Sequence, residues 1–137
     1  METHCSYIPY QQTGYFSKLI IDYLNNEKAL QPFYNFRPQL ENIEAAINQR
    51  KDFKHRAVLV DELQKQYQDL ELPEKVSLNI QSLSNNNTFT ITTAHQPNIF
   101  TGPLYVVYKI FHVIKLAEEL KQKFIQYNFV PVYFMGS

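Results

Sequence analysis

Two short apolar segments on either side of one long helical pattern constrain the fold of this chain most strongly. TFTITT at residues 88–93 is β-branched, short and bounded by turn residues, which predicts a strand. NFVPVYFM at 128–135 predicts a second strand, and residues 103–124 between them have a helical pattern that is apolar on nearly all sides as far as Leu116. Strand, long helix and strand form a βαβ unit, and continuous apolar strands are typical of a parallel sheet that is covered on both faces.

The second predicted strand carries apolar side chains on both faces, and it ends at Met135 in a chain of 137 residues. Two parallel strands make a poor sheet, and an exposed apolar edge promotes aggregation. We therefore expect a truncated sequence, the N-terminal part of a longer α/β protein. The predicted fold class is α/β, with a helical N-terminal region followed by the first βαβ unit of a parallel sheet.

The first 85 residues are predicted to be helical. Ser17 can cap a helix in SKLIIDYLNN, and Pro38 suits the first turn of a second helix, PQLENIEAAINQRK. A third helix is expected from about Phe53 to Leu70. The apolar side predicted for this third helix consists of Val58, Leu59, Leu63, Tyr67 and Leu70.

A shorter helix, EKVSLNIQSL, follows Pro73, and the polar tract at residues 84–87 stops it and forms a turn. The pattern changes from helical to β-branched directly after this tract. We therefore predict a helical region over 1–85 and an incomplete core domain over 86–137.

Charge and cysteine content exclude several classes of function. The 13 basic residues balance 13 acidic ones, so no overall field favours nucleic acid or an anionic membrane. The lone Cys5 excludes an intrachain disulfide framework and a cysteine-based zinc site, and it fits a reducing, cytoplasmic setting. The sequence contains no metal-binding motif, no secretion signal and no apolar stretch of membrane-spanning length, so we expect no metal site and no membrane partner.

The connection after the first predicted strand is the candidate ligand site, because ligands of open α/β sheets bind beyond the carboxyl ends of the strands. Three neutral polar side chains, His95, Gln96 and Asn98, lie in this connection. His95 could act as an acid, a base or a hydrogen-bond donor.

The start of the following helix suits an anion, because its free N–H groups carry partial positive charge. Thr101 is predicted as its N-cap, Gly102 allows close approach of the backbone, and Pro103 fits just inside the helix. Tyr105 and Lys109 are one turn apart, so both can lie on one face of this helix.

A purely structural explanation of the same residues stays open. Asn, Thr, Gly and Pro also build ordinary turns and caps, and a histidine in a turn often bonds to the backbone. A lysine such as Lys109 often extends along an apolar surface to reach water. Spacing alone does not decide between a turn and a site.

The segments ITTAHQPNIFTGPLYVVYKIFHVIKLAEEL and YNFVPVYFMGS resemble the bacillithiol biosynthesis cysteine-adding enzyme family, which are cysteine ligases. The block from Thr101 to Tyr105, Thr-Gly-Pro-Leu-Tyr, carries the resemblance together with Lys109. The specific similarity covers about residues 88–137, whereas the helical part is similar only in general character.

The resemblance implies a Rossmann-like core related to nucleotidyltransferases, with a coiled coil further along. The implied reaction joins cysteine to the amino group of a glucosaminyl-malate, with ATP or another nucleotide activating the cysteine carboxylate. The implied partners are these small molecules and, in the full-length protein, a second copy of the chain as a homodimer. The residues expected to be catalytic are His95 and Asn98, and those expected to bind substrate or nucleotide are Gln96, Thr101, Gly102, Tyr105 and Lys109.

Two departures from the family pattern affect this expectation. Ala94 stands where many relatives have Gly, and Pro97-Asn98 replaces Ala-Gly, which stiffens the connection. An acidic Ser-Glu-Asp segment follows the second strand in the family but is absent here, so we expect part of a pocket that is inactive alone. Two alternatives remain: a noncatalytic interaction module that uses helices 38–50 and 53–70, and a nucleotidyltransferase-like enzyme that acts on another substrate.

Overall fold

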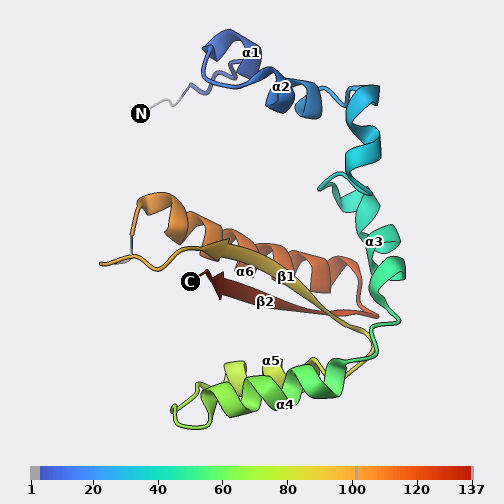
Figure 1. Cartoon of the computed structure of the whole chain (residues 1–137), viewed down its shortest axis with the longest axis vertical. Helices are drawn as coiled ribbons and strands as arrows, with labels where there is room; N and C mark the ends of the chain where they lie inside the picture. The colour runs from blue at the N-terminus through green and yellow to red at the C-terminus, as the bar shows by residue number, and fades with distance from the viewer. Residues whose placement is uncertain (1–3, 101, 137) are drawn as a thin grey trace. The chain divides into compact units, whose positions relative to one another are not determined.

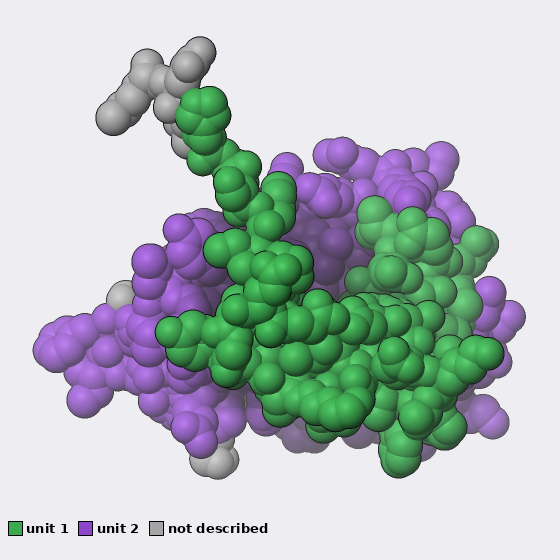
Figure 2. All heavy atoms as spheres, turned by 90° about the horizontal axis from the view of Figure 1, so that it is seen from above, with its two compact units in different colours: residues 1–46 green, residues 47–137 purple. Residues whose placement is uncertain are grey.

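The computed structural model describes residues 4–100 and 102–136, which form two compact units. The first unit comprises residues 1–46 and the second comprises residues 47–137 (Figure 2). The domain boundary expected between residues 85 and 86 stays a prediction. The helices and strands, labelled in Figure 1, are α1 (Tyr10–Thr13), α2 (Lys18–Leu24), η1 (Lys28–Phe33), η2 (Leu40–Asn42), α3 (Ile43–Arg50), α4 (Arg56–Tyr67), α5 (Glu74–Ser82), β1 (Thr88–His95), α6 (Leu104–Lys123) and β2 (Asn128–Met135).

The first unit is held by contacts around one tyrosine and one arginine. The rings of Tyr23 and Tyr34 meet edge to face at 5.4 Å, and the Arg37 guanidinium lies 5.4 Å from the Tyr23 ring centroid. Arg37 Nη2 also donates a hydrogen bond of 3.1 Å to the carbonyl of Leu24 at the end of α2. None of residues 4–46 is buried, so aromatic and cation–π contacts hold this unit in place of an apolar core.

Two details of the predicted helices in this unit differ in the structure. Ser17 is at the N-cap position of α2, as predicted, but its side chain makes no capping hydrogen bond. The helix predicted from Pro38 starts later, because Gln39 is extended and a 3-10 turn precedes the α-helix that begins at Ile43. The Asn42 side chain donates to the carbonyl of Arg37 at 3.1 Å, a local bond that competes with helical hydrogen bonding.

The second unit contains the predicted βαβ arrangement, with α6 connecting two parallel strands (Figure 1). Thr88 pairs with Asn128 at one end of the sheet, and His95 pairs with Met135 at the other. Strand β1 is longer than its predicted end at Thr93, and the His95 carbonyl accepts a hydrogen bond of 3.1 Å from Gly136 N. His95 therefore belongs to the sheet and does not lie in a free loop.

Pro131 lies in the middle of β2, opposite Ile91, without interrupting the pairing. The backbone N–H groups of Asn128 and Gly136 donate to the carbonyls of Asn87, just before β1, and of His95, at its end. Because alternate residues of a parallel strand bond to the same neighbour, even-numbered residues of β2 face β1. The nitrogen of Pro131 therefore faces the outer edge, where its missing hydrogen costs the ladder nothing.

Helices pack on both faces of the sheet, but the cover is less complete than the continuous apolar strands predict, because Thr90, Thr92 and Ala94 of β1 are exposed. On one face Val130 packs with Val60 of α4 and with Ile80 and Leu83 of α5. Neighbouring strand residues point to opposite faces, so Phe129 lies on the other face, where α6 packs. Phe129 is 1% exposed, and its ring contacts those of Phe89 and Phe124.

The buried side of α4 differs from the predicted one. Val60, which the predicted stripe omitted, is buried, and Leu63 and Tyr67 pack beside it as expected. Val58, Leu59 and Leu70 are 59%, 39% and 60% exposed, so the apolar side predicted through them was wrong at these positions. Positions 60, 63 and 67 lie on one face of a helix, and this face is set by packing against α5 and β2, which the pattern of α4 alone does not reveal.

Arg56 continues this buried side of α4 and joins three elements. Its Nη1 donates to the carbonyls of Leu83, just after α5, at 3.1 Å and of Thr88, in β1, at 2.9 Å. The guanidinium also lies 5.8 Å from the centroid of the Phe89 ring. Arg56 thus fixes the start of β1 relative to both helices on that face.

Within the described residues, no helix combines the length and the apolar character needed to cross a membrane.

Replacing Phe129 with alanine should lower the free energy of unfolding by about 3–5 kcal/mol, because the change leaves a cavity between the sheet and α6. The matched control is Phe134→Ala in the same strand, where the side chain is 61% exposed and the loss should stay below about 1 kcal/mol. Urea unfolding monitored by circular dichroism measures both values. Equal losses in the two variants would contradict the assignment of Phe129 to the core.

Candidate functional site

Four of the residues predicted for the site come together at the carboxyl end of β1. The His95 side chain is half-buried, and its Nε2 lies 2.7 Å from the Tyr105 hydroxyl oxygen on the first turn of α6. Its Nδ1 lies 2.7 Å from Nδ2 of Asn98 in the connection between β1 and α6. His95, Asn98 and Tyr105 thus form a continuous hydrogen-bonded chain across the carboxyl edge of the sheet.

Lys109 is the fourth member of this cluster. Its Nζ donates to the carbonyl of Ala94 at 3.3 Å and lies 5.6 Å from the centroid of the Tyr105 ring. The side chain is exposed, so the ammonium group is held beside Tyr105 while it remains in contact with solvent. A cation and a hydroxyl group next to each other suit a ligand with an anionic oxygen.

Gln96 and Thr101 are not part of the described cluster. The described contacts of Gln96 use its backbone carbonyl, which accepts from Asn98 Nδ2 at 2.7 Å and lies 2.9 Å from His95 Nδ1. Thr101 lies outside the described residues. A binding role for either side chain stays a prediction.

Helix α6 begins one residue later than predicted. Its N-cap is Pro103, whose extended backbone has φ −64° and ψ 149°, and the first helical residue is Leu104. Pro103 was expected just inside the helix, but its extended ψ angle places it in the connection. The Thr101 N-cap prediction falls on a position that the structure does not describe.

Gly102 is essential to the shape of the connection for two reasons. Its φ of +68° lies in the left-handed region, which disfavours side chains. A Cβ atom at this position would also lie only 2.8 Å from Cβ and Cγ of Asn98. The absence of a side chain at Gly102 therefore allows Asn98 to reach His95. The sequence had instead predicted that Gly102 lets the backbone approach an anion.

An apolar cavity of about 300 Å³ adjoins the cluster at Asn98. It lies between the connection, α6 and the carboxyl end of β2. Its lining residues are Asn98, Val106, Val107, Ile110, Phe111, Tyr133 and Met135. Sequence reasoning did not find the walls from β2, although Tyr133 and Met135 alternate along one strand and so share a face.

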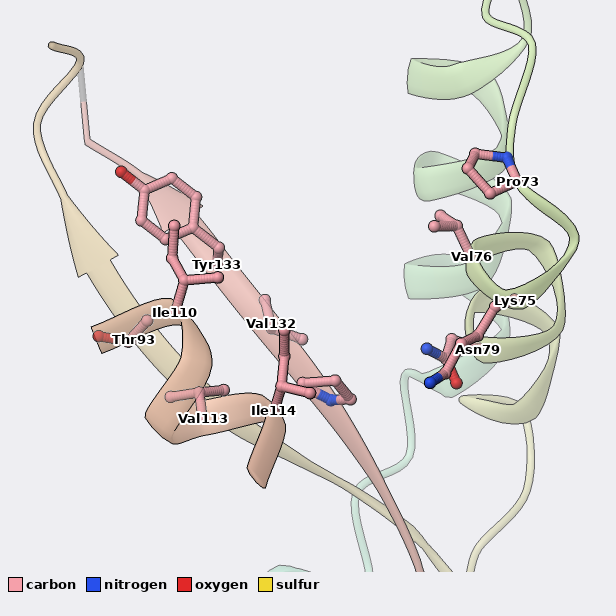
Figure 3. A pocket seen from close by; sticks show the side chains of 11 residues that line it. Pro73, Lys75, Val76, Asn79, Thr93, Ile110, Val113, Ile114, Val132 and Tyr133 are labelled. Carbon is pink, nitrogen blue, oxygen red and sulfur yellow. The ribbon is translucent and has the colours of Figure 1, made fainter. Parts of the chain in front are cut away.

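A second cleft, of about 360 Å³, runs along β2 and shares Ile110 and Tyr133 with the first cavity. Figure 3 shows Pro73 and Val76, from the α5 side, across the cleft from Ile114 and Val132. Apolar side chains dominate its lining, so a molecule bound there would make mainly apolar contacts and few hydrogen bonds.

In the part of the chain that the structure describes, no three or more His, Cys, Asp or Glu side chains come together in a group that could bind a metal ion.

Residues 1–137 match the protein family described as "Bacillithiol biosynthesis BshC, N-terminal Rossmann-like domain". This chain belongs to the BshC family. The match covers the helical part of the chain as well as the βαβ unit, so the resemblance extends beyond the strands and the connection that first indicated it. The parallel pair of strands, joined by a helix, agrees with the Rossmann-like description.

Curated relatives support this membership over the full length of the chain. The chain is 49% identical over 141 residues to the "Putative cysteine ligase BshC" of Flavobacterium psychrophilum and 50% identical over 140 residues to that of Flavobacterium johnsoniae. Both alignments include 100% of this chain but only 26% of the relative. The protein of the same name from Cytophaga hutchinsonii is 47% identical over 128 residues, which are 93% of this chain and 24% of that protein.

Replacing Gly102 with alanine should destabilise the chain more than the same change at Gly14. Both glycines have a left-handed backbone, with φ of +68° and +69°, so alanine should cost about 1–2 kcal/mol at either position. Only at Gly102 does the new Cβ meet another side chain, because nothing lies within 4 Å of one at Gly14. Urea unfolding should show an additional loss of about 1 kcal/mol or more for Gly102→Ala, and equal losses would contradict the close contact with Asn98.

Proposed function

We propose that this chain forms one part of the active site of a BshC-type cysteine ligase, which adds cysteine to glucosaminyl-malate in bacillithiol biosynthesis. Membership of the BshC family and the printed names of the relatives support the reaction class. The remaining three quarters or so of such an enzyme would supply the other walls of the site, because the chain spans 26% of these relatives. We therefore expect the 137-residue chain alone to form no product.

The observation that carries the proposal is the cluster of His95, Asn98, Tyr105 and Lys109 beyond the carboxyl end of β1. This is the edge at which α/β sheets bind their ligands. The cluster contains a titratable imidazole, a hydroxyl group and an ammonium group within reach of one another. Amide-bond formation needs such groups, because a proton leaves the attacking amine while negative charge develops on the carboxyl oxygens.

In this proposal His95 moves or holds a proton at the reacting groups. Tyr105 and Lys109 bind an anionic oxygen of a substrate, either a carboxylate or a phosphate. The N-terminus of α6, which begins at Leu104, contributes partial positive charge toward the same anion, and Gln96 orients the substrate. The backbone N–H of Gly102 already donates to the Ile99 carbonyl at 3.2 Å, so Gly102 acts through the shape of the connection.

A carboxylate is a poor acceptor for an amine, so the reaction also needs activation of cysteine, for which ATP or another nucleotide is the expected source. The hydroxyl and ammonium groups of Tyr105 and Lys109 fit a phosphate oxygen of such a nucleotide. A cytoplasmic location and a homodimer of the longer protein remain predictions that accompany this function.

The His95→Ala change in the full-length protein should lower kcat/KM by roughly 10²–10⁴-fold, the usual contribution of a positioned acid or base. The assay supplies cysteine, glucosaminyl-malate and ATP and measures the cysteinyl product by mass spectrometry, with ATP omitted in a parallel reaction. The control is His112→Ala, since His112 is exposed on α6 and lies outside the cluster, and this change should alter the rate by no more than about twofold.

Three results would contradict parts of the proposal. An unchanged rate in His95→Ala would remove His95 from the reaction. Product formation with a different amine but not with glucosaminyl-malate would favour a nucleotidyltransferase-like enzyme of another specificity. A full-length protein that forms no product and binds no nucleotide would favour the noncatalytic interaction module.

A further inference from the structure

The Nδ1 atom of His95 faces both a hydrogen-bond donor and a hydrogen-bond acceptor. The amide nitrogen of Asn98 lies 2.7 Å from it, and the carbonyl oxygen of Gln96 lies 2.9 Å from it. The same Asn98 nitrogen lies 2.7 Å from the Gln96 carbonyl. These three distances together restrict where the imidazole hydrogen can lie.

The Asn98 amide has two hydrogens, which match two acceptors in this arrangement. In one arrangement the Asn98 hydrogens go to the Gln96 carbonyl and to a bare His95 Nδ1, which leaves the two acceptors, Nδ1 and the Gln96 oxygen, 2.9 Å apart. If Nδ1 carried the hydrogen, it would donate to the Gln96 carbonyl, and the hydrogen-bearing nitrogens of His95 and Asn98 would lie only 2.7 Å apart. Rotating the amide would instead place two oxygens 2.7 Å apart, at Asn98 and Gln96. The bare Nδ1 is favoured because it keeps the 2.7 Å hydrogen bond from Asn98 and leaves the most widely separated pair of like groups.

A neutral His95 therefore carries its hydrogen on Nε2, 2.7 Å from the Tyr105 oxygen. This N–H donates to Tyr105, so the hydroxyl hydrogen of Tyr105 must point away from His95. Tyr105 is 51% exposed, which allows this hydrogen to be directed at a bound molecule.

We infer that Asn98 is a positioning residue that fixes His95 as its Nε2–H tautomer, so that the Tyr105 hydroxyl donates its hydrogen to an anionic oxygen of the substrate. The part that concerns the substrate rests on the proposed ligase function, whereas the tautomer depends only on this chain. The ligand is a carboxylate or a phosphate, because the Lys109 ammonium group lies beside the Tyr105 ring. Asn98 acts through His95 and needs no contact with the substrate.

Gly102 provides independent support for this role of Asn98. The space that a Cβ atom of residue 102 would occupy is taken by Asn98, at 2.8 Å from both Cβ and Cγ. The missing Cβ atom at Gly102 thus leaves the room in which the Asn98 side chain reaches His95.

Nitrogen NMR of the full-length protein labelled with ¹⁵N at histidine tests the tautomer directly. At alkaline pH, where free imidazole is neutral, the His95 signals should show a bare Nδ1 and a protonated Nε2. His95→Gln identifies the signals by removing them. Asn98→Asp should invert the tautomer, because a carboxylate at this position accepts a hydrogen from Nδ1.

Tyr105→Phe is the matched control, because it removes the partner of Nε2 and leaves Asn98 in place. It should keep the Nε2–H tautomer while it abolishes the proposed donation to substrate. An Nδ1–H tautomer in the unmodified protein, or an unchanged tautomer in Asn98→Asp, would overturn the inference. If Asn98→Asp does not fold, Asn98→Ala replaces it, and a mixture of tautomers is then the expected result.

Steady-state kinetics test the proposed hydrogen bond from Tyr105 to the substrate separately from the tautomer of His95. Asn98→Asp and Tyr105→Phe should each lower kcat/KM roughly ten- to hundredfold, the value of one hydrogen bond to a charged group. A rise in KM for cysteine identifies a carboxylate as the acceptor, and a rise in KM for ATP identifies a phosphate. Unchanged kinetics in both variants would overturn the donation by Tyr105. A full-length protein that has the expected tautomer but forms no cysteinyl product would contradict the ligase proposal and leave the role of Asn98 intact.

Discussion

Parallel pairing of β1 with β2 is the constraint on which the second unit depends. Parallel neighbours cannot be joined by a tight turn, so the chain must cross back over the sheet, and α6 makes this crossing. Because the crossing starts at the carboxyl end of β1, the last residue of that strand meets the first turn of the helix. The contact between His95 and Tyr105 follows from this geometry. The candidate site is therefore a consequence of strand direction as much as of the residues in the connection.

On the face of the sheet opposite α6, packing depends on hydrogen bonds from one arginine side chain to the backbone. Arg56 bonds to the backbone at Leu83 and Thr88, where α5 gives way to β1. Its charge-assisted hydrogen bonds satisfy the Leu83 carbonyl, at the end of α5, and the Thr88 carbonyl, which faces the edge of β1 away from β2. The apolar cluster around Val60 and Val130 then packs on a fixed frame. One cation thus sets the position at which β1 enters the sheet.

The sequence was sufficient to predict the helices and strands of the second unit, but not α1 and η1 of the first unit. It also did not reveal the contacts that select which face of a helix is buried. Continuous apolar strands predicted the parallel pair correctly, whereas the predicted cover is incomplete on the face where Thr90, Thr92 and Ala94 of β1 are exposed. The strand end at His95 was missed, because its pairing uses Gly136, which is distant in sequence. The position of Val60 was missed for a similar reason, since α4 alone has apolar residues on several sides. Spacing placed Tyr105 and Lys109 on one helix face, but it could not show that Asn98 reaches His95 only because Gly102 has no side chain.

The proline in β2 has a consequence for how the sheet can grow. The outer edge of this strand presents every second backbone N–H to whatever lies beside it, and at Pro131 that donor is missing. A strand that added there would leave one of its own carbonyl groups without a partner, unless water or a side chain filled the place. This edge therefore pairs completely only with a strand whose remaining carbonyl group finds another hydrogen-bond donor. Identical chains that met edge to edge would form an interrupted ladder, which slows the unwanted association that an apolar strand would otherwise invite.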